Sequence, residues 1–460
     1  MHKLKKLIPQ DIKNIYHLAQ AILANFWYGF PSRKINPHTN FLPNSVIKFL
    51  HSRGIGVGVK VIGVTGTNGK TTTVQMIAKI LEEAGFKTAV ASTINFKING
   101  NEEINRTKFT TLSSWAVQKF IKKAIENGCE YLVLETSSHS LDQYRVWGVA
   151  YNTAVVTNIT REHLDYHKTM EEYRKAKIQL FKKVKTAVVN LDMEKPEEFL
   201  AYAKNSVFAY SISNDKLPMT NQCQNPNVKI QKIIAKNVEL GINGSKYEIQ
   251  NTKYEIHLLG EFNIENALAA TCVAISENID LETIAKALEK IKLVPGRMER
   301  VENSKGLNII VDYAVTPDSL EKLYELIKSI RNNSPEIRES SKIIAVFGSC
   351  GERDRGKRPI MGEIVSKKAD FVIVTNEDPY NEDPMQIINE VSEGIKNRIE
   401  GNNFWKILDR REAIRKALEI AKAGDFVVVT GKGAEEIMAV GDKRIPWNDR
   451  KVIEEELFKK

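Results

Sequence analysis

From Lys60 onward, short apolar runs alternate along the chain with segments whose apolar residues recur every three or four positions. The run at 61–64 predicts a buried strand, and the segment 74–81 predicts a helix with one apolar face. Strands that alternate with helices in this way indicate an α/β fold with a mostly parallel sheet. Further buried strands are expected at 131–134, 154–157 and 187–190.

This alternation is interrupted and then restarts. Residues 210–260 carry short runs of alternating polarity, such as 247–250, which predict a small antiparallel excursion. Helical periodicity returns at 263–274 and 281–291. Beyond Pro295-Gly296 a second α/β unit begins, in which each strand is followed by a helical candidate, so a domain boundary is expected there. Its strands are expected at 308–311, 343–347, 371–375 and 426–430.

The first 60 residues are poorly patterned and are interrupted by Pro31, Pro37, Pro43 and the glycines of 54–58. The most apolar run, 15–30, contains polar residues and no cleavage site typical of a signal peptide. It is also too short to span a bilayer comfortably. We expect a helix packed on the body of the protein, with a helix lying on a membrane surface as the alternative.

Composition and charge narrow the class of protein. With 460 residues, 42% apolar and 27% charged, the chain is typical of a globular protein of two to three domains. Cys129, Cys223, Cys272 and Cys350 form no CxxC pair, which argues against a zinc site or a disulfide framework and fits a reducing cytoplasm. The net charge of +10, without any nucleic-acid-binding signature, favours a phosphate- or carboxylate-bearing substrate.

A glycine-rich loop at 63–73 lies between the first predicted strand and helix, the context that a phosphate-binding loop requires. Its glycines allow backbone N–H groups to point at oxyanions, and the helix that follows adds its positive end. Lys70 is expected to reach the outer phosphates, and the Thr71 hydroxyl to ligate magnesium. The loop differs from the strict G-x-x-x-x-G-K-[ST] pattern at one position. Val64 occupies the position of the first glycine, and Gly63 lies one residue earlier.

Two further polar segments follow predicted strands. Glu135 ends the strand at 131–134, and a carboxylate at the carboxyl end of a parallel strand is well placed to help hold the metal. The segment after the next strand contains Glu162, His163, Asp165 and His167, which suggests a metal site or, alternatively, an exposed polar loop. No HExxH spacing is present, so a zinc hydrolase is disfavoured.

Motifs along residues 60–460 resemble, in order, those of the Mur ligases, which add amino acids to the peptidoglycan precursor. In detail they are most similar to the MurE type, which adds the third residue of the stem peptide. The resemblance implies a short amino-terminal UDP-substrate domain at 1–59, a P-loop-type central ATP-binding domain at 60–295 and a Rossmann-like carboxyl-terminal ligase domain at 296–460. The motifs lie at 66–72, 135–139, 158–166, 173–181, 260–266, 295–299, 312–318, 348–359 and 431–435.

The resemblance also implies a reaction. ATP phosphorylates the terminal carboxylate of a UDP-N-acetylmuramoyl-dipeptide, and the amine of a free amino acid then displaces phosphate. Thr71 and Glu135 are expected to hold one magnesium ion, and His163 and Lys177 to serve a second. In the family the lysine that matches Lys177 is carbamylated. A cytoplasmic monomer without nucleic acid or stable membrane insertion is expected.

Other site residues are carried over from the motifs that they match. Lys70, His163 and Lys177 are the expected catalytic residues. The expected ATP-binding residues are Gly66, Thr67, Asn68, Gly69, Lys70, Thr71, Thr72, Asn266, Arg297 and Asp312. The expected substrate-binding residues are Thr110, Thr111, Ser138, Arg145, Arg353, Asp378, Tyr380, Gly431 and Glu435.

The sequence departs from the family in three places. The segment before the loop is shorter than usual and lacks a clear uridine-binding serine motif, so UDP recognition is the weakest inference. Tyr380 replaces the arginine of the Asp-Asn-Pro-Arg motif that grips the distal carboxylate of meso-diaminopimelate. A tyrosine cannot form the bidentate pair that an arginine forms with a carboxylate. L-lysine or another amino acid without the distal carboxylate is therefore predicted, unless Tyr380 has a structural role. Val315 and Ala434 replace two usual histidines, for which altered substrate contacts are expected.

Two alternatives stay open at this point. One is another amide ligase of the same fold, such as a folylpolyglutamate synthase or a poly-amino-acid synthetase. The other is a non-catalytic nucleotide-binding scaffold in cell-wall assembly, against which the retained Lys70, Glu135, His163 and Lys177 argue.

Overall fold

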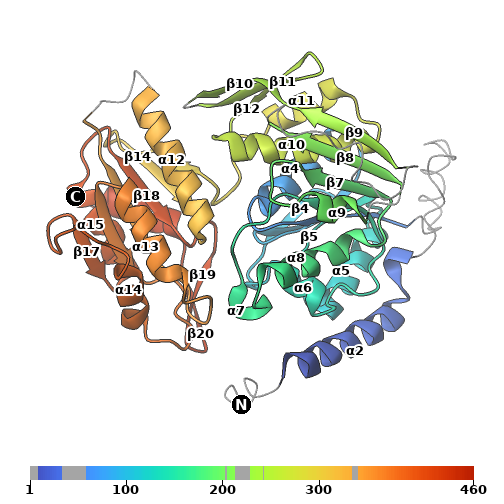
Figure 1. The fold of residues 1–460 in the computed structure, drawn as a ribbon, viewed down its shortest axis with the longest axis horizontal. Coiled ribbons are helices and arrows are strands. Elements are labelled where there is room, and N and C mark those ends of the chain that lie inside the picture. The colour runs from blue at the N-terminus through green and yellow to red at the C-terminus, as the bar shows by residue number, and fades with distance from the viewer. Residues whose placement is uncertain are drawn as a thin grey trace.

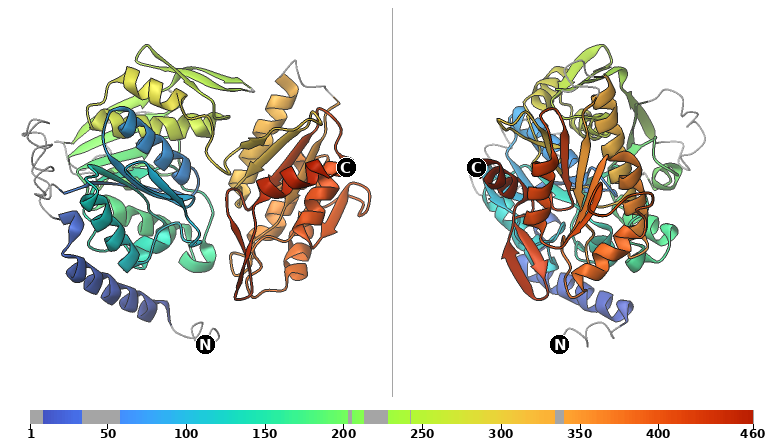
Figure 2. Two further views of the ribbon diagram at one scale, coloured as in Figure 1. Left: turned by 180° about the vertical axis from the view of Figure 1, so that it is seen from behind. Right: turned by 90° about the vertical axis from the view of Figure 1, so that its left-hand side faces the viewer.

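Two α/β units lie side by side in the computed structural model (Figures 1 and 2), which describes residues 9–33, 58–202, 205–212, 228–241, 243–333 and 340–459. The central unit contains a nine-stranded sheet, and the carboxyl-terminal unit contains a six-stranded sheet. The predicted α/β fold with mostly parallel sheets is confirmed. The predictions concerning Pro37, Pro43, 54–57 and Cys223 lie outside the described residues.

The central sheet has the order β4-β3-β2-β5-β1-β6-β7-β8-β9. The strands from β2 to β9 in this order pair in parallel, and only β3 and β4 at one edge are antiparallel. The strands are β1 (Lys60–Thr65), β2 (Thr88–Ala91), β3 (Asn95–Ile98), β4 (Asn101–Ile104), β5 (Tyr131–Glu135), β6 (Tyr151–Val156), β7 (Thr186–Asn190), β8 (Ser206–Ser211) and β9 (Lys229–Ile234). All four strands predicted within the first 190 residues are present.

Both faces of this sheet are covered by helices, which explains why its strands are continuous apolar runs. Ile62 and Val64 point to the face covered by α4, α10 and α11, whereas Val61 points to the face covered by the other helices. The first set is α4 (Lys70–Glu83), α10 (Glu261–Ser276) and α11 (Leu281–Glu289). The second set includes α5 (Ser114–Glu126), α6 (Ser138–Asp142), α7 (Leu164–His167), α8 (Met170–Ile178), η3 (Gln179–Phe181) and α9 (Glu197–Leu200).

The region predicted as an antiparallel excursion is divided between two sheets. Its first part supplies the end of β8 and all of β9, which extend the central sheet in parallel. Its second part forms the antiparallel sheet of β10 (Lys236–Gly241), β11 (Gly244–Ile249) and β12 (Thr252–Ile256). The prediction is therefore correct for residues 236–256 and wrong for 229–234, where Ile233 is buried in the core of the central unit.

The carboxyl-terminal sheet has the order β13-β14-β18-β15-β16-β17, parallel except for β13 at its edge. Its strands are β13 (Glu299–Val301), β14 (Asn308–Asp312), β15 (Ile343–Phe347), β16 (Phe371–Thr375), β17 (Phe404–Ile407) and β18 (Phe426–Thr430). Its helices are α12 (Pro317–Asn333), α13 (Lys357–Lys368), α14 (Pro384–Ser392), α15 (Arg410–Ile420) and α16 (Asp449–Phe458). The four predicted strands are present. However, β18 is followed by the hairpin β19 (Ile437–Val440) and β20 (Lys443–Pro446) rather than by a helix.

Before the central unit, helix α2 (Gln10–Tyr28) is followed by η1 (Pro31–Arg33). Figure 1 shows α2 lying along the outside of the central unit, on the side of α5 and α6. Asn25 of α2 contacts the central unit, because its Nδ2 donates a hydrogen bond of 2.8 Å to the backbone carbonyl of Trp147. The expected packed helix is thus present, although Phe26 and Trp27 remain mostly exposed. Among the described residues, no helix combines the length and apolar content needed to cross a membrane.

Candidate active site between the two units

The glycine-rich loop connects the carboxyl end of β1 to the first residue of α4, Lys70. The backbone N–H groups of Thr67 and Asn68 donate to the backbone and side-chain oxygens of Asn158, each at 2.9 Å. A Cβ on Gly66 would lie 1.9 Å from Thr157 Oγ1, and one on Gly69 would lie 2.2 Å from Asn266 Oδ1. The tight path of this loop therefore requires glycine at both positions.

Gly63, which was grouped with this loop, belongs to the strand instead. It lies inside β1, where a Cβ would come within 2.7 Å of the Tyr151 ring. Its small size is needed for packing beneath the sheet, so the loop that faces a ligand begins at Gly66.

Lys70 lies at the N-terminal end of α4 with its Nζ 2.8 Å from the backbone carbonyl of Thr67. Burial lowers the pKa of this amine, and the Arg297 guanidinium lowers it further, whereas the charges of Glu135 and Glu162 raise it. Among the described residues, no carboxylate lies within ion-pair distance of Lys70. A cation placed at a helix N-terminus beside glycine-loop N–H groups is suited to phosphate oxygens.

The proposed magnesium ligands Thr71 and Glu135 lie next to each other. Thr71 Oγ1 lies 3.2 and 3.1 Å from the two Glu135 carboxylate oxygens. Glu135 also accepts from the Thr93 backbone N–H at 2.7 Å and from its hydroxyl at 3.0 Å. A carboxylate and a hydroxyl oriented toward each other at a phosphate loop offer the hard oxygen ligands that Mg²⁺ prefers.

Three residues expected on the nucleotide side come from both units. Arg297 Nη2 donates to Thr71 Oγ1 at 3.2 Å, which joins the carboxyl-terminal unit to the phosphate loop. Asn266 accepts from Thr73 Oγ1 at 3.2 Å. Asp312 accepts from the Met298 backbone N–H at 2.7 Å, and burial raises its pKa. The structure therefore brings all three residues to the loop.

Lys177 is fully buried and its Nζ donates to the backbone carbonyl of Gly66 at 2.8 Å. Burial places the pKa of this amine well below its usual value, and the nearby Lys70 lowers it further. Two buried atoms in the same region, Glu162 Oε2 and His163 Nδ1, have no hydrogen-bond partner. These polar groups can accommodate a further ligand or cation.

The four polar side chains predicted after β6 do not form a metal cluster by themselves. His167 Nε2 faces Ser138 Oγ at 3.0 Å, and Asp165 is exposed. Within the described ranges, no group of three or more His, Cys, Asp or Glu side chains is arranged to hold a metal ion. A second cation would therefore need a donor of another kind.

The residues expected to contact a peptide substrate gather around the start of α5 and α6. Thr111 Oγ1 donates to the Glu135 carbonyl at 2.8 Å, and Arg145 Nη1 donates to the Thr111 carbonyl at 2.7 Å. Ser138 is buried at the start of α6, and Thr110 lines the cavity between the units. Of these four residues, Thr110 lines the same cavity as the phosphate loop, and Thr111 and Arg145 are linked to it through the Glu135 backbone.

The residues expected to bind the amino acid lie across the cavity, on the carboxyl-terminal unit. Asp378, Tyr380, Glu435 and Arg353 all line this cavity of about 290 Å³ together with the phosphate loop. Gly431 lies beside them with φ of 112°, and a Cβ there would come within 2.5 Å of Glu377 Oε2. The guanidinium of Arg353 lies 5.7 Å from the centre of the Tyr380 ring. The predicted nucleotide and amino-acid residues therefore converge from the two units.

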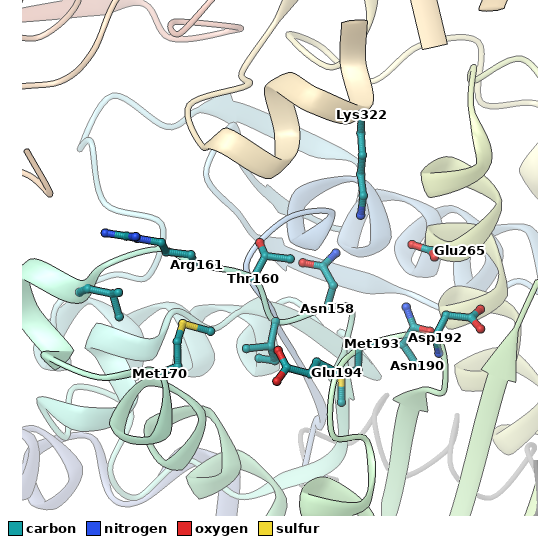
Figure 3. Close-up of a pocket in the computed structure, with 12 residues that line it drawn as sticks. Asn158, Thr160, Arg161, Met170, Asn190, Asp192, Met193, Glu194, Glu265 and Lys322 are labelled. Atoms are coloured by element: carbon teal, nitrogen blue, oxygen red, sulfur yellow. The ribbon is translucent and has the colours of Figure 1, made fainter. Parts of the chain in front are cut away.

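A second cavity of about 560 Å³ shares Asn158 and Lys322 with the lining of the first. Figure 3 shows Lys322 extending from α12 toward Asn158, with Glu265 approaching from α10. Burial raises the pKa of Glu265 to about 7. Asn158 and Glu265 lie within the motifs at 158–166 and 260–266 but were given no expected role, and Lys322 lies in none of the motifs.

Three lysines of the site were also missed by the sequence analysis. Lys108 reaches from the central unit to Asp378 at 2.7 Å, and Lys357 reaches from α13 to Glu162 at 3.0 Å. Lys432 is fully buried and lies 2.9 Å from both Asp378 carboxylate oxygens. Lys108 and Lys357 pair with residues far away in sequence, whereas Lys432 also pairs with Glu435, three residues on. Lys357 and Lys432 lie within the motifs at 348–359 and 431–435, so only Lys108 had no signal in the sequence.

Comparison with protein families gives two matches that cover most of the chain. The Mur ligase middle domain matches residues 64–274, and the Mur ligase, glutamate ligase domain matches residues 296–433. The first matched region contains the phosphate loop from Gly66, and the second contains Arg353, Asp378 and Tyr380 of the cavity lining.

Individual relatives agree with these matches. The UDP-N-acetylmuramoyl-L-alanyl-D-glutamate--2,6-diaminopimelate ligase of Clostridium tetani is 38% identical over 443 residues, which cover 95% of this chain and 80% of the relative. The protein of the same name from Bacillus cereus is 35% identical over 458 residues, covering 96% of this chain and 82% of the relative. A solved structure with that name is 31% identical, with a TM-score of 0.57 over 89% of this chain and 80% of the other.

Proposed function

Because the chain belongs to the Mur ligase family, we propose that it adds the third amino acid to UDP-N-acetylmuramoyl-L-alanyl-D-glutamate, and that this amino acid is L-lysine. The resemblance predicted from the motifs is thereby confirmed, and the chain is an ATP-dependent, ADP-forming ligase. The scaffold and folylpolyglutamate alternatives are not favoured. The carboxylates of Asp378 and Glu435, gathered around the ammonium of Lys108, support an amino acid with a side-chain amine. The observation that carries the choice of L-lysine is the uncharged Tyr380 in the lining of the same cavity.

The proposed reaction has two steps. A carboxylate oxygen of the dipeptide attacks the γ-phosphorus of ATP, which releases ADP and forms an acyl phosphate. The amine of the amino acid then attacks the acyl carbon, phosphate leaves and the amine loses a proton. Such phosphoryl transfer depends on positioning and charge neutralisation, which we assign to the N-terminal end of α4, to Lys70 and to Arg297.

Mg²⁺, held by Thr71 and Glu135, would neutralise charge on the phosphate oxygens. We propose a second ion next to Glu162, His163 and a carbamylated Lys177. Carbamylation requires a neutral amine, whose nitrogen attacks CO2 and loses a proton, and the low pKa of buried Lys177 favours that state. The unpartnered atoms Glu162 Oε2 and His163 Nδ1 are the observation that fits such an ion.

The amino-acid pocket has a basic and an acidic part. We assign the α-carboxylate of the amino acid to Arg353, for which the described residues offer no carboxylate within ion-pair distance. The side-chain amine is assigned to Asp378 and Glu435. Tyr380 provides no charge for a distal carboxylate, which is the reason to prefer L-lysine to diaminopimelate.

One observation favours a second candidate, meso-diaminopimelate; the relatives' names specify 2,6-diaminopimelate. The guanidinium of Arg444, on β20, lies 5.6 Å from the centre of the Tyr380 ring. Although it comes from another strand, this arginine offers the missing positive charge near position 380. Under this alternative Arg444 would bind the distal carboxylate.

The chain spans about four fifths of the length of these relatives, at 80% and 82%. We propose that residues 1–59 belong to the UDP-substrate domain, 60–295 to the ATP-binding domain and 296–460 to the ligase domain. Recognition of the uridine diphosphate by the first of these is the part with the least support.

A substrate panel tests the proposal. Tripeptide formation from ATP and UDP-N-acetylmuramoyl-L-alanyl-D-glutamate is measured with L-lysine and with meso-diaminopimelate, in the parent and in Arg444→Met. We expect L-lysine to be preferred at least about tenfold in kcat/KM, which is the effect of about 1.4 kcal/mol of differential binding. A preference for meso-diaminopimelate that Arg444→Met abolishes would establish the second candidate instead.

A further inference from the structure

The carboxylate pair of the amino-acid pocket is already occupied by an ammonium group of the same chain. Lys108 Nζ lies 2.7 Å from Asp378 Oδ2 and also contacts Glu435 Oε2. The Lys108 side chain is only 11% exposed, so water competes little for these contacts. The position of this ammonium is the one that an incoming side-chain amine would need.

The remaining partners of the pair belong to the carboxyl-terminal unit and are fixed there. Lys432 is fully buried, contacts both carboxylates and donates to the Ile437 carbonyl at 2.8 Å. The Ala439 backbone N–H donates to Asp378 Oδ1 at 2.7 Å. Among the residues that the structure describes, Lys108 is the only partner of these carboxylate groups from the central unit. It is therefore the partner that can be exchanged.

The backbone beside Lys108 is held in place, so exchange requires movement of the side chain rather than of the whole loop. Asn105 Nδ2 donates to the carbonyls of Ser92 at 2.8 Å and Phe109 at 3.0 Å. Lys108 itself has a φ of 63°, in the left-handed region. It lies two residues before Thr110, which is one of the expected substrate-binding residues and lines the same cavity.

The charges explain what exchange achieves. The two carboxylates face two ammonium groups, those of Lys432 and Lys108, so the cluster is neutral as it stands. If the side-chain amine of the amino acid bound in addition to Lys432 and Lys108, its positive charge would have no carboxylate to neutralise it. If the amine replaces Lys108, the cluster stays neutral. An amino acid with an apolar side chain gains nothing from the pair, which stays bound to Lys108.

We infer that Lys108 is a specificity-determining residue, an internal ammonium that the side-chain amine of the amino acid displaces from Asp378 and Glu435. This inference rests on the proposed function of the site. Displacement costs binding free energy, because the pocket accepts the amine only in the fraction of molecules in which Lys108 has left.

The experiment compares Lys108→Met with Lys108→Arg, which keeps the charge, and with Lys119→Met, which removes an exposed lysine of α5. KM and kcat are measured with L-lysine and with L-norleucine, which has a similar chain without the amine. We expect Lys108→Met to lower KM for L-lysine about tenfold with kcat changed less than about threefold, because the internal competitor is gone. KM for L-norleucine should not fall, Lys119→Met should match the parent, and Lys108→Arg, which keeps the internal competitor, should not lower KM for L-lysine.

An unchanged or raised KM for L-lysine in Lys108→Met would overturn the inference, because Lys108 would then be a structural ion pair. Binding of L-lysine is also measured by calorimetry in the presence of a non-hydrolysable ATP analogue. If no variant ligates any amino acid, the proposed function fails, but tighter L-lysine binding by Lys108→Met would still support displacement. Equal or absent binding in the parent and Lys108→Met would overturn it.

Discussion

The guanidinium of Arg297 donates a hydrogen bond of 3.2 Å to the hydroxyl of Thr71, although 226 residues separate them. This contact places a positive charge of the carboxyl-terminal unit on the phosphate loop of the central unit. The Arg297 guanidinium also stacks on the Tyr313 ring at 4.6 Å, which fixes its direction. ATP bound at the loop would thus meet groups from both units, and the relative position of the units would affect catalysis.

Arg297→Ala should lower kcat by about 100-fold, because one preorganised charge on the transferred phosphoryl group is lost. Arg300→Ala, which removes an exposed arginine of β13, serves as the matched control and should retain parental activity. Steady-state ADP release measures both. Equal kcat values in the two variants would show that Arg297 does not act on the phosphates.

Gly69→Ala should weaken ATP binding at least about tenfold, because a Cβ there would displace Asn266, whose Oδ1 would lie 2.2 Å away. Gly85→Ala is a sharp control, since Gly85 has a similar φ of 86° but no atom within 4 Å of its Cβ position. It should cost about 1 kcal/mol in stability without changing ATP affinity. Calorimetric titration measures the ATP affinity of both variants. An equal loss of affinity in Gly69→Ala and Gly85→Ala would refute the steric explanation.

Lys177→Gln should lower ligase activity by about 100-fold if a carbamate at this position supports the second ion. In the parent, incubation with ¹³C-labelled bicarbonate should give a protein-bound carbamate signal by NMR, and the variant should lack it. Lys175→Gln, an exposed lysine on the same helix, should keep both the signal and the activity. A signal that persists in Lys177→Gln would place the carbamate elsewhere.

Glu377→Gln should stabilise the protein at alkaline pH. Burial, and then the charge of Asp378, raise the pKa of Glu377 from 4.5 to about 7. A carboxyl group whose pKa is raised by folding contributes stability below its unfolded pKa, and this is lost as pH rises through its folded pKa. The melting temperature of the variant should therefore exceed that of the parent at pH 8, and the gap should close below pH 4.5. Glu393→Gln, at an exposed position, should show no such trend, and a gap independent of pH would contradict the prediction.

The sequence predicted the parts of the fold that depend on local apolar patterns. The strands at β1, β5, β6 and β7 are apolar runs buried on both faces, so their position could be read directly. The hairpin of β19 and β20 was missed because all four residues of β20 are exposed and have no apolar periodicity. The parallel pairing of β9 was missed because its outer face is polar at the sheet edge.

The site was predictable where its residues form contiguous motifs and not where they meet through the fold. Thr71 and Glu135 were identified from their place after a loop and a strand, and the structure brings them within hydrogen-bond distance. Lys108 was not identified from the sequence, because its partner Asp378 is 270 residues away and no local pattern marks Lys108. Gly63 was misassigned because the spacing of glycines cannot distinguish a loop from a strand packed against Tyr151.

The most direct test of the account follows oxygen through the reaction. The enzyme is incubated with ATP, Mg²⁺, L-lysine and UDP-N-acetylmuramoyl-L-alanyl-D-glutamate whose reacting carboxylate carries ¹⁸O, and the products are measured by mass spectrometry. The account predicts one tripeptide for each ADP, with one ¹⁸O atom transferred to each phosphate. ADP formed without tripeptide, or phosphate without ¹⁸O, would contradict it.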